Sequence, residues 1–494
     1  MNSKILFWMN DDLSGLGLPK ILNEKYNLDI YSVFDITDKQ KIFFQNQKLI
    51  NFTKIWFYHD YISKSFPKAD DVYLKNIEEK YDLNLSLLIS AERFFTQSNL
   101  FYDFTQEEKL SIVEQTCKFF ESMLDEIRPD FVIMGITTLL HNHIFFKICK
   151  NRGIKILMIR PSFLAGKYII SNSIDSFENS AYEKKFNFHN NQELTNYLQN
   201  YNSTEQSKFV RDNFQNSIIL YFKAILHYIF SKNSNPDTHF TYFGRTKIKV
   251  IQKMISYTLK TKIRKSFIDK NLILKMKNKK PYIYFPLQIE QERSLSLAAP
   301  SHTNQIEVIK NILKNLPKGY ELYIKEHPMM ILRGWRPTSD YKEIINLPNV
   351  KLFHPNVKSD TLIRNSSLVI TISSTSGIEA AFMEKPSIVF ADVDYASISS
   401  VEKLNSINEL SNLINNSLEM KPNIDDLNNY LNLVESNSFE LNLLKLSSEF
   451  DSQFHFTGLL ADVEIPLQKM KSYLDDNRDI FEKLAIQFIK KIRN

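Results

Sequence analysis

The sequence predicts an α/β protein with two separate parallel sheets, and three observations support this fold class. Short apolar segments alternate with helical segments in two stretches, one ending near residue 174 and one between residues 281 and 400. The apolar segments are short buried runs, as is typical of parallel strands covered on both faces. A chain of 494 residues is also too long for one hydrophobic core. We therefore expect at least two domains.

The first half, residues 1–174, shows a β-α-β pattern. Its expected elements are strands at 5–9, 53–58 and within P-D-F-V-I-M-G-I-T-T (129–138), a helix at 139–151 closed by Gly153, and a strand at 154–159. This order predicts a Rossmann-like domain, residues 1–174. Residues 175–280 break the alternation, and we interpret them as a helical, basic insertion and linker.

The second half, residues 281–400, repeats the alternation more clearly. Its expected elements are strands at 282–287, 320–325, 350–353, 368–372 and 387–391, with helices at 305–316, 358–364 and 378–384. Residues 401–494 are expected to form a helical tail that packs back on the domains. Two Rossmann-like halves with such a tail fit the GT-B architecture, in which substrates bind in a cleft between the halves.

Composition narrows the classes of function. Cys117 and Cys149 are the only cysteines, which excludes a disulfide framework and a cysteine-based zinc site and favours a reducing cytoplasm. The N-terminal apolar stretch is too short for a signal peptide, and the apolar run at 217–230 is too short to cross a bilayer. No metal site is expected.

The charge is concentrated in residues 243–280, where 13 lysines or arginines face one acid, Asp269. Isoleucines and leucine recur there at helical spacing, which indicates a basic amphipathic helix. The alternatives are a solvated helix face near a domain junction, a surface that docks on an anionic membrane or lipid-linked acceptor, and a nucleic-acid surface. No aromatic-rich nucleic-acid-binding module or zinc finger accompanies the basic residues, so we expect no nucleic-acid partner.

The clearest chemical motif follows the expected strand 368–372. The chain there gives four hydroxyl side chains, one glycine and one acid in sequence: Ser373, Ser374, Thr375, Ser376, Gly377 and Glu379. Backbone N–H groups at a helix start, supplemented by hydroxyls, form a phosphate cradle. The glycine would let the backbone approach the ligand, and the glutamate would accept hydrogen bonds from ribose. An ordinary helix cap is the alternative.

Two further motifs lie after strands of the same half. The strand 320–325 ends in K-E-H-P, so Lys325 and His327 are candidates to meet a phosphate, and Pro328 is expected at the first turn of a helix. His327 is also a candidate acid for the departing phosphate oxygen. The segment F-P-L-Q-I-E-Q-E-R carries an amide and two carboxylates at alternating positions. These are Gln288, Glu290 and Glu292, of which the carboxylates are candidate bases, unless the segment is a solvated acidic loop.

These motifs, in this order, resemble the capsule polysaccharide biosynthesis glycosyltransferases, and in particular their Kdo-transferring enzymes. The similarity covers Q-x-E, K-E-H-P and S-S-T-S-G-I-E-A followed by K-P-S-I-V-F, all within residues 282–395. It extends to bacterial sialyltransferases on a GT-B fold, although no acid-acid-glycine triplet precedes His327. The resemblance implies a CMP-activated acidic sugar donor, with His327 at its phosphate, the loop 373–376 at CMP, and Glu290 near the reacting carbon.

Fewer residues are candidates for the acceptor-binding side of the site than for the donor side. Asp11 and Asp12 follow the first strand and are candidate acceptor-side bases, and His141 follows a later strand as a candidate lining residue. Solvated loop acids are the alternative for the two aspartates. No D-x-D metal–diphosphate pair is evident, in agreement with metal-independent transfer and no cofactor beyond the nucleotide sugar.

The sequence thus predicts a cytoplasmic glycosyltransferase, peripheral on the inner face of the membrane, that acts on a glycan or lipid-linked acceptor. Two alternatives keep the fold: a CDP-glycerol-type phosphotransferase and a UDP-sugar enzyme. A third alternative is a non-catalytic scaffold of a membrane-associated assembly.

Overall fold

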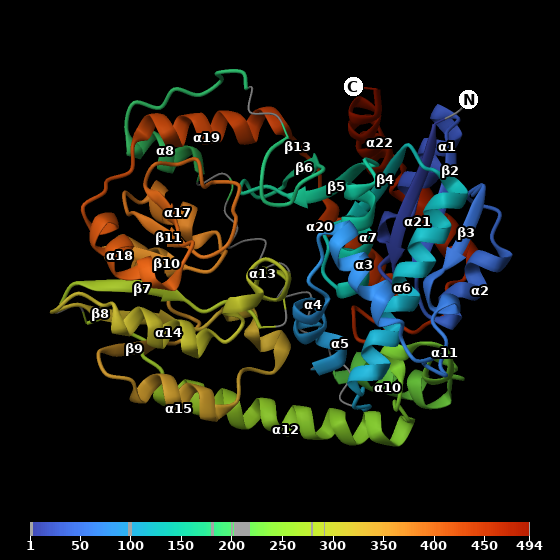
Figure 1. Ribbon diagram of the computed structural model, residues 1–494, viewed down its shortest axis with the longest axis horizontal. Coiled ribbons are helices and arrows are strands. Elements are labelled where there is room, and N and C mark those ends of the chain that lie inside the picture. The colour runs from blue at the N-terminus through green and yellow to red at the C-terminus, as the bar shows by residue number, and fades with distance from the viewer. Residues whose placement is uncertain are drawn as a thin grey trace. The chain divides into compact units, whose positions relative to one another are not determined.

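The computed structural model describes residues 3–96, 101–178, 182–198, 201, 218–277, 280–290 and 292–493 (Figure 1). Within them the chain forms two compact units. Unit 1 comprises residues 1–174, 203–249 and 438–494, and unit 2 comprises residues 175–202 and 250–437. The expected insertion, residues 175–280, and the expected tail, residues 401–494, are each divided between the two units.

Unit 1 is built on a seven-stranded sheet with the order β13-β6-β5-β4-β1-β2-β3. The strands are β1 (Lys4–Asn10), β2 (Asp29–Asp35), β3 (Lys54–Phe57), β4 (Phe131–Gly135), β5 (Lys155–Pro161), β6 (Lys167–Ser171) and β13 (Ser438–Glu440). The strands from β3 to β5 are parallel, and β6 and β13 extend the sheet antiparallel. The order 3-2-1-4-5 of the parallel strands is Rossmann-like, as the sequence predicts.

Helices cover both faces of the unit 1 sheet. The helices of this unit are α1 (Gly17–Tyr26), α2 (Asp38–Asn46), α3 (Asp71–Tyr81), α4 (Leu85–Ala91), α5 (Arg93–Thr96), α6 (Gln106–Ile127), α7 (Leu140–Asn151), α10 (Ile218–Phe230), α11 (Asn235–Thr238), α20 (Leu443–Phe454), α21 (Leu467–Asp476) and α22 (Arg478–Arg493). One core joins the sheet to α1, α2 and the three C-terminal helices through side chains such as Phe7, Phe34 and Phe481. On the other face, Trp8 packs on Phe120 of α6 and Phe145 of α7.

Unit 2 is built on a six-stranded parallel sheet with the order β12-β11-β10-β7-β8-β9. The strands are β7 (Tyr282–Pro286), β8 (Glu321–Lys325), β9 (Val350–Phe353), β10 (Leu368–Thr371), β11 (Ser387–Val389) and β12 (Val401–Lys403). Counted from β7, this is the order 3-2-1-4-5-6 of a doubly wound dinucleotide-binding fold. The prediction of two Rossmann-like α/β halves is confirmed.

The unit 2 sheet lies between two layers of helices (Figure 1). The helices of this unit are α8 (Asn191–Leu198), α13 (Arg293–Ser296), α14 (Gln305–Lys314), α15 (Thr338–Asn346), α16 (Ser359–Arg364), α17 (Ser376–Phe382), α18 (Leu410–Leu418) and α19 (Ile424–Asn437), with most of α12 (Lys247–Asn271). One core joins the sheet to α14, α15 and α18, and a second core on the opposite face joins it to α16 and α17.

The tail is mostly helical, as predicted, but it also contains two short strands. It contributes the edge strand β12 to the unit 2 sheet and the edge strand β13 to the unit 1 sheet. Each strand is only three residues long, and neither contains an apolar run that sequence periodicity can detect.

Candidate functional site

The three chemical motifs of unit 2 meet at one edge of its sheet. The strand order reverses between β7 and β10, and open α/β sheets bind ligands outside the carboxyl ends of strands at such a point. Gln288 follows β7, and the hydroxyl loop, residues 373–376, follows β10. His327 follows β8, the other neighbour of β7. Segments up to 85 residues apart in the chain are therefore neighbours at this edge.

Gln288 connects the first strand to the hydroxyl loop. Its side chain is buried, with 4% of its surface exposed. With the amide oxygen turned toward the loop, it accepts hydrogen bonds from the backbone N–H groups of Ser373 at 2.7 Å and Ser374 at 3.2 Å. Its own backbone is held by Gln305, at 2.7 and 3.1 Å. Gln288 therefore shapes the loop, and its assignment as a direct nucleotide contact stays a prediction.

The hydroxyl loop offers fewer backbone donors than its sequence suggests. Besides the two N–H groups bound by Gln288, that of Ser376 donates to Ser374 Oγ at 3.3 Å, and that of Gly377 donates to the Ser374 carbonyl at 3.3 Å. These four N–H groups already have acceptors, so the expected cradle of free backbone donors is not present there. The hydroxyl of Thr375 is exposed and donates to Glu379 Oε1 at 2.7 Å.

Gly377 is a glycine for a packing reason. A Cβ at this position would lie 2.7 Å from the hydroxyl oxygen and 3.0 Å from a ring carbon of Tyr395. That hydroxyl in turn donates to the Ser374 carbonyl at 2.6 Å and so fixes the loop. The expected reason, close approach of a ligand, is replaced by close approach of a tyrosine.

Lys325 and Glu379 link the K-E-H-P segment to the hydroxyl loop. The ammonium of Lys325 is buried and donates to Ser359 Oγ at 2.9 Å. Burial lowers the pKa of Lys325 to about 8, although the carboxylates of Glu379 and Glu326 act in the opposite direction. Burial likewise raises the pKa of Glu379, against its hydrogen bond from Thr375. A buried, incompletely compensated cation therefore lies at this edge, which favours binding of an anion.

His327 is half-buried and caps a short helix. Its Nδ1 accepts a hydrogen bond from the N–H of Met329 at 3.2 Å, and Pro328 begins the 3₁₀ helix η6 (Pro328–Arg333), as predicted. Burial, with the charges of Lys325 and Arg336, lowers the pKa of His327 to about 4. The imidazole is therefore neutral at pH 7, and because Nδ1 is an acceptor, the proton is on Nε2.

A buried ion network that the sequence analysis missed holds this segment in place. Glu326 is fully buried and accepts hydrogen bonds from Arg336 Nε at 2.8 Å, Tyr341 Oη at 2.7 Å and the His327 N–H at 2.6 Å. The Arg336 guanidinium, 3% exposed, also donates to the Gln288 carbonyl at 2.5 Å and to Glu290. The network thus joins both motifs. Its signal in the sequence is the acid inside K-E-H-P, Glu326, which directly precedes His327.

The two candidate bases differ in their surroundings. Glu290 pairs with Arg336 and keeps about 33% of its side chain exposed. Burial raises the pKa of Glu290, and the nearby Arg336 opposes that shift only in part. Glu292 lies half-buried at the N-cap of α13. The catalytic assignments of Glu290 and Glu292 stay predictions. Of the two, Glu290 is the one that contacts the buried ion network, through Arg336.

The acceptor-side candidates lie at the corresponding edge of the unit 1 sheet. Asp11 follows β1, and burial, with the charge of Asp35, raises the pKa of Asp11 to about 6. Asp12 is exposed and caps the 3₁₀ helix η1 (Leu13–Gly15) by accepting from the Ser14 N–H at 3.0 Å. Asp12 therefore has a structural role, and Asp11 is the better candidate base.

His141 is not a lining residue, contrary to the prediction. It is 3% exposed, and its Nε2 lies 2.9 Å from Asp35 Oδ2, while His59 Nε2 lies 3.0 Å from Asp35 Oδ1. The two imidazoles hold the pKa of Asp35 well below its usual range even though the carboxylate is buried. His141 thus pairs with a carboxylate at the end of β2, a strand that the sequence analysis did not identify.

Among the described residues, no group of three or more His, Cys, Asp or Glu side chains could hold a metal ion. A search of the same residues finds no helix that is both long and apolar enough to span a membrane.

The fold and the site geometry indicate a Rossmann-type ligand site. Comparison with known proteins matches part of the chain to a protein family. Residues 193–399 match the family model described as Capsule polysaccharide biosynthesis protein. This span contains all three unit 2 motifs, so the resemblance to capsule polysaccharide biosynthesis glycosyltransferases is confirmed for this part of the chain.

A curated relative, Protein FixF of Sinorhizobium fredii (strain NBRC 101917 / NGR234), is 31% identical over 120 residues, which is 23% of this chain. The chain spans about a quarter (27%) of the length of that relative. The similarity to Protein FixF is therefore limited to this portion of each protein.

Solved structures are similar at low identity. The beta Kdo 2,7 transferase of Thermosulfurimonas dismutans KpsC is 10% identical, with 76% of this chain and 92% of that chain covered and a TM-score of 0.32. The UDP-GlcNAc 2-epimerase of Methanocaldococcus jannaschii is 14% identical, with 85% and 94% covered and a TM-score of 0.23.

Proposed function

We propose that the protein is a glycosyltransferase of capsule or surface-glycan synthesis. Its donor is a CMP-activated acidic sugar of the Kdo or sialic-acid type, and its acceptor is a glycan or glycolipid. The observation that supports this most strongly is the meeting of Lys325, His327 and the hydroxyl loop at the topological switch point of unit 2, within the family match.

The donor phosphate would bind between these groups. Lys325 supplies a positive charge, His327 a hydrogen bond from Nε2–H, and Thr375 a hydroxyl. In the reaction the bond between the anomeric carbon and the phosphate oxygen breaks, and negative charge develops on the departing nucleotide. Donors fixed in advance at that oxygen stabilise the charge. The neutral state of His327 makes it a hydrogen-bond donor in the free enzyme, and a bound phosphate would raise its pKa.

The acceptor hydroxyl forms the new bond to the anomeric carbon, and its proton passes to a carboxylate. Asp11 and Glu290 both have pKa values raised by burial, which makes each a stronger base than an exposed carboxylate. We propose that unit 1 presents the acceptor.

The direct test is release of CMP from CMP-Kdo or CMP-sialic acid, together with thermal shifts for CMP, CDP and UDP. A nucleotide present at about 100 times its dissociation constant adds about 2.7 kcal/mol to the free energy of unfolding. We expect CMP to give the largest shift. A larger shift with CDP or UDP would favour a CDP-glycerol-type phosphotransferase or a UDP-sugar enzyme, and no shift would overturn the donor assignment.

The pKa of Lys325 predicts how nucleotide affinity depends on pH. Between pH 7 and 10 a CMP phosphate is fully ionised, so only the protein titrates. Phosphate binding favours the charged ammonium, and because its pKa in the free protein is about 8, affinity should fall by up to about tenfold per pH unit above that value. Isothermal titration with CMP measures this. The variant Lys325→Arg stays charged and should show a flat profile, and a wild-type affinity independent of pH would contradict the assignment.

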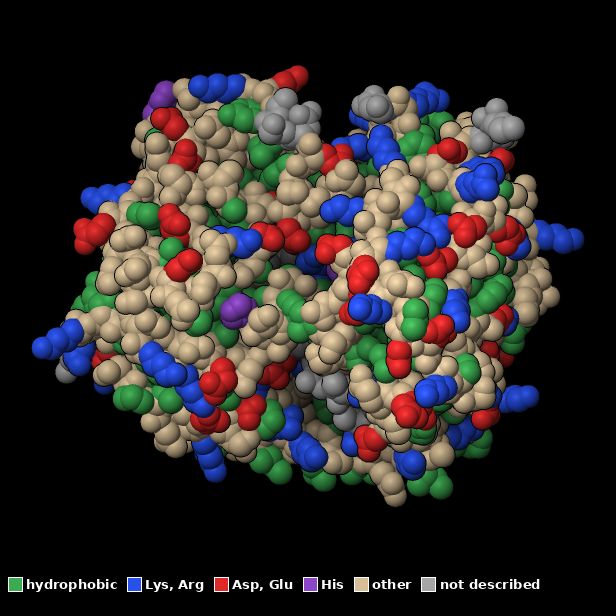
Figure 2. Space-filling model, viewed as in Figure 1, with side chains coloured by type: hydrophobic (Ala, Val, Ile, Leu, Met, Phe, Trp, Pro, Cys, Tyr) green, Lys and Arg blue, Asp and Glu red, His purple; other side chains and the backbone are tan. Residues whose placement is uncertain are grey.

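We further propose that α12 docks the protein on the inner face of an anionic membrane. The side chains of Ile255, Leu259 and Ile263 share one helix face and are 54%, 57% and 64% exposed. Figure 2 shows hydrophobic and basic side chains interspersed along the lower edge of the view, where α12 lies. An apolar stripe flanked by lysines is typical of interfacial helices. Residues 278 and 279 of the basic segment lie outside the described residues.

Two basic residues of α12 have structural roles. Arg264 donates to the carbonyl groups of Gly334 at 3.1 Å and Trp335 at 2.8 Å, and Lys265 pairs with Asp269 at 2.6 Å. A test of membrane binding must therefore use other lysines.

Replacement of Lys253, Lys260 and Lys262 with glutamate should weaken binding to phosphatidylglycerol vesicles about 100-fold or more. Each lysine near an anionic surface contributes about 1 kcal/mol. Cosedimentation with vesicles measures the effect, and the same change at the exposed residues Lys314, Lys318 and Lys421 is the control of equal net charge. Equal binding by both triple variants would remove the docking assignment.

A further inference from the structure

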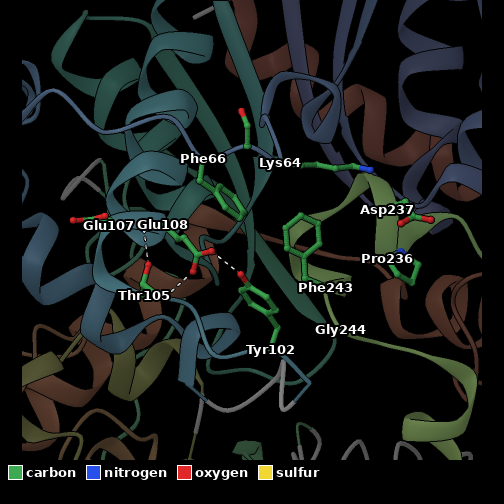
Figure 3. A pocket seen from close by; sticks show the side chains of 11 residues that line it. Lys64, Phe66, Tyr102, Thr105, Glu107, Glu108, Pro236, Asp237, Phe243 and Gly244 are labelled. Atoms are coloured by element: carbon green, nitrogen blue, oxygen red, sulfur yellow. Dashed lines mark hydrogen bonds between the residues drawn. The ribbon is translucent and has the colours of Figure 1, made fainter.

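A pocket of roughly 440 Å³ lies in unit 1 and is lined by residues of that unit alone. Figure 3 shows the rings of Phe66, Tyr102 and Phe243 around one space, with Lys64 and Asp237 on one side and Glu107 and Glu108 on the other. The ring centroids of Phe66 and Phe243 are 5.6 Å apart, and those of Tyr102 and Phe243 are 5.8 Å apart. The volume is within the range of about 300–1,000 Å³ of small-ligand pockets.

The local backbone is built to shape this pocket. Phe66 has a φ of 42°, a left-handed conformation that costs a non-glycine residue about 1–3 kcal/mol and clusters at functional sites. Gly244 has a φ of 74°, and a Cβ there would lie 2.2 Å from the Phe101 carbonyl oxygen. Tyr102 is fixed by its hydrogen bond to Glu108 at 2.6 Å. The ring of Phe66 is therefore held by a strained backbone, and the ring of Tyr102 by a hydrogen bond.

Three polar side chains of the pocket are available to a ligand. Within the part of the chain that the structure describes, Lys64, Glu107 and Asp237 have no side-chain hydrogen bond or ion pair. Glu108, by contrast, already accepts from Tyr102 and from the Thr105 backbone. Rigid apolar ring faces with a few unpaired donors and acceptors match a sugar ring, which presents C–H groups on its faces and hydroxyls at its edge.

The charge of the pocket selects among sugars. One lysine stands against three carboxylates, so the lining is net negative. An acidic sugar would be repelled, whereas a neutral sugar could donate its hydroxyls to the carboxylates and accept from the lysine.

A chain of ring contacts leads from the pocket to the Asp35 pair of unit 1. The ring of Phe104 packs on that of Phe243, and its centroid lies 6.4 Å from the centroid of the Phe240 ring. The Phe240 centroid in turn lies 5.5 Å from that of His59, and His59 pairs with Asp35. Burial raises the pKa of Tyr242, the neighbour of Phe243, and the charge of Asp11 adds to that shift.

We propose that this pocket is a subsite for a neutral saccharide unit of the acceptor glycan, in the same unit as the candidate base Asp11. The proposal rests on the proposed glycosyltransferase function. It assigns acceptor recognition to an aromatic pocket of unit 1 and separates it chemically from the site for the acidic donor sugar.

The test is binding of the full-length protein to an immobilised array of neutral, N-acetylated and acidic oligosaccharides, followed by titration with the saccharides retained. We expect neutral saccharides to bind. Ser65→Trp, which fills the pocket from an exposed position, and Asp237→Asn should each lower the affinity at least tenfold. Lys68→Ala, an exposed change in the same loop outside the pocket, should leave it unchanged.

Several outcomes would overturn the subsite: no saccharide bound by the wild type, preference for acidic saccharides, equal affinity in Ser65→Trp, or displacement by tetramethylammonium, which would indicate a cation cage instead. CMP binding is measured in parallel. Saccharide binding without CMP binding would remove the proposed transferase while keeping the pocket, and CMP-sugar turnover without saccharide binding would remove only the pocket.

Discussion

Replacing Arg336 with methionine is expected to lower the free energy of unfolding by about 3–5 kcal/mol, the usual cost of removing one partner of a buried ion pair. The guanidinium is 3% exposed and is shared by Glu326, which is fully buried, and Glu290. Without it, the Glu326 carboxylate keeps only the Tyr341 hydroxyl and the His327 N–H as donors. Chemical denaturation monitored by circular dichroism measures the loss.

Two control variants show whether the loss arises from an unpaired buried charge. Arg333→Met removes an exposed arginine three residues earlier and should change stability by less than about 0.5 kcal/mol. The double variant Glu326→Gln/Arg336→Met removes both charges and should recover part of the loss. A double variant less stable than Arg336→Met alone would contradict the ion-network account.

His327→Ala is expected to lower the rate of CMP release by about 10²–10³-fold, the usual effect of removing one preorganised donor to a developing charge. The imidazole also caps η6, so the alanine variant should lose about 0.5–2 kcal/mol of stability as well. His327→Asn keeps a side-chain acceptor for the Met329 N–H, and it should recover stability without recovering the rate. Steady-state kinetics and thermal unfolding separate the two effects.

The second His-Pro segment supplies a matched control. His354 Nδ1 accepts from the Asn356 N–H at 3.1 Å, the same local bond that His327 makes at 3.2 Å, but its Nε2 faces Asp269 at 3.2 Å. His354→Ala therefore removes an equivalent cap and should leave the turnover number nearly unchanged. If the two alanine variants lose activity equally, the effect of His327 is structural. If His327→Ala keeps full cellular function, the non-catalytic scaffold is the better interpretation.

Periodicity predicted both sheets because their central strands are buried on both faces. The run at β10 and the strand before K-E-H-P each ended within one residue of the predicted position. The edge strands β12 and β13 were missed because their sequences, V-E-K and S-F-E, contain no apolar run, whereas β11, equally short, lies in the apolar run 387–391. β2 was missed although it has seven residues, and with it Asp35, the partner of His141.

The site was harder to predict, because residue type does not reveal which polar groups are already hydrogen-bonded within the folded protein. The sequence placed Gln288 at the correct strand end, but its burial makes it a support for the loop. It also placed Gly377 in the loop, but the neighbour that requires a glycine, Tyr395, lies 18 residues further along and is evident only after folding. Arg336 was missed for the same reason, because its three partners come from two other segments, one with Gln288 and Glu290 and one with Glu326.

A crystal soaked with CMP tests the central claim most directly. The account predicts electron density for the nucleotide at the carboxyl ends of β7, β8 and β10, with the phosphate within hydrogen-bond distance of Lys325 Nζ and His327 Nε2. Density for CMP anywhere else, or a phosphate in contact with neither side chain, would contradict it.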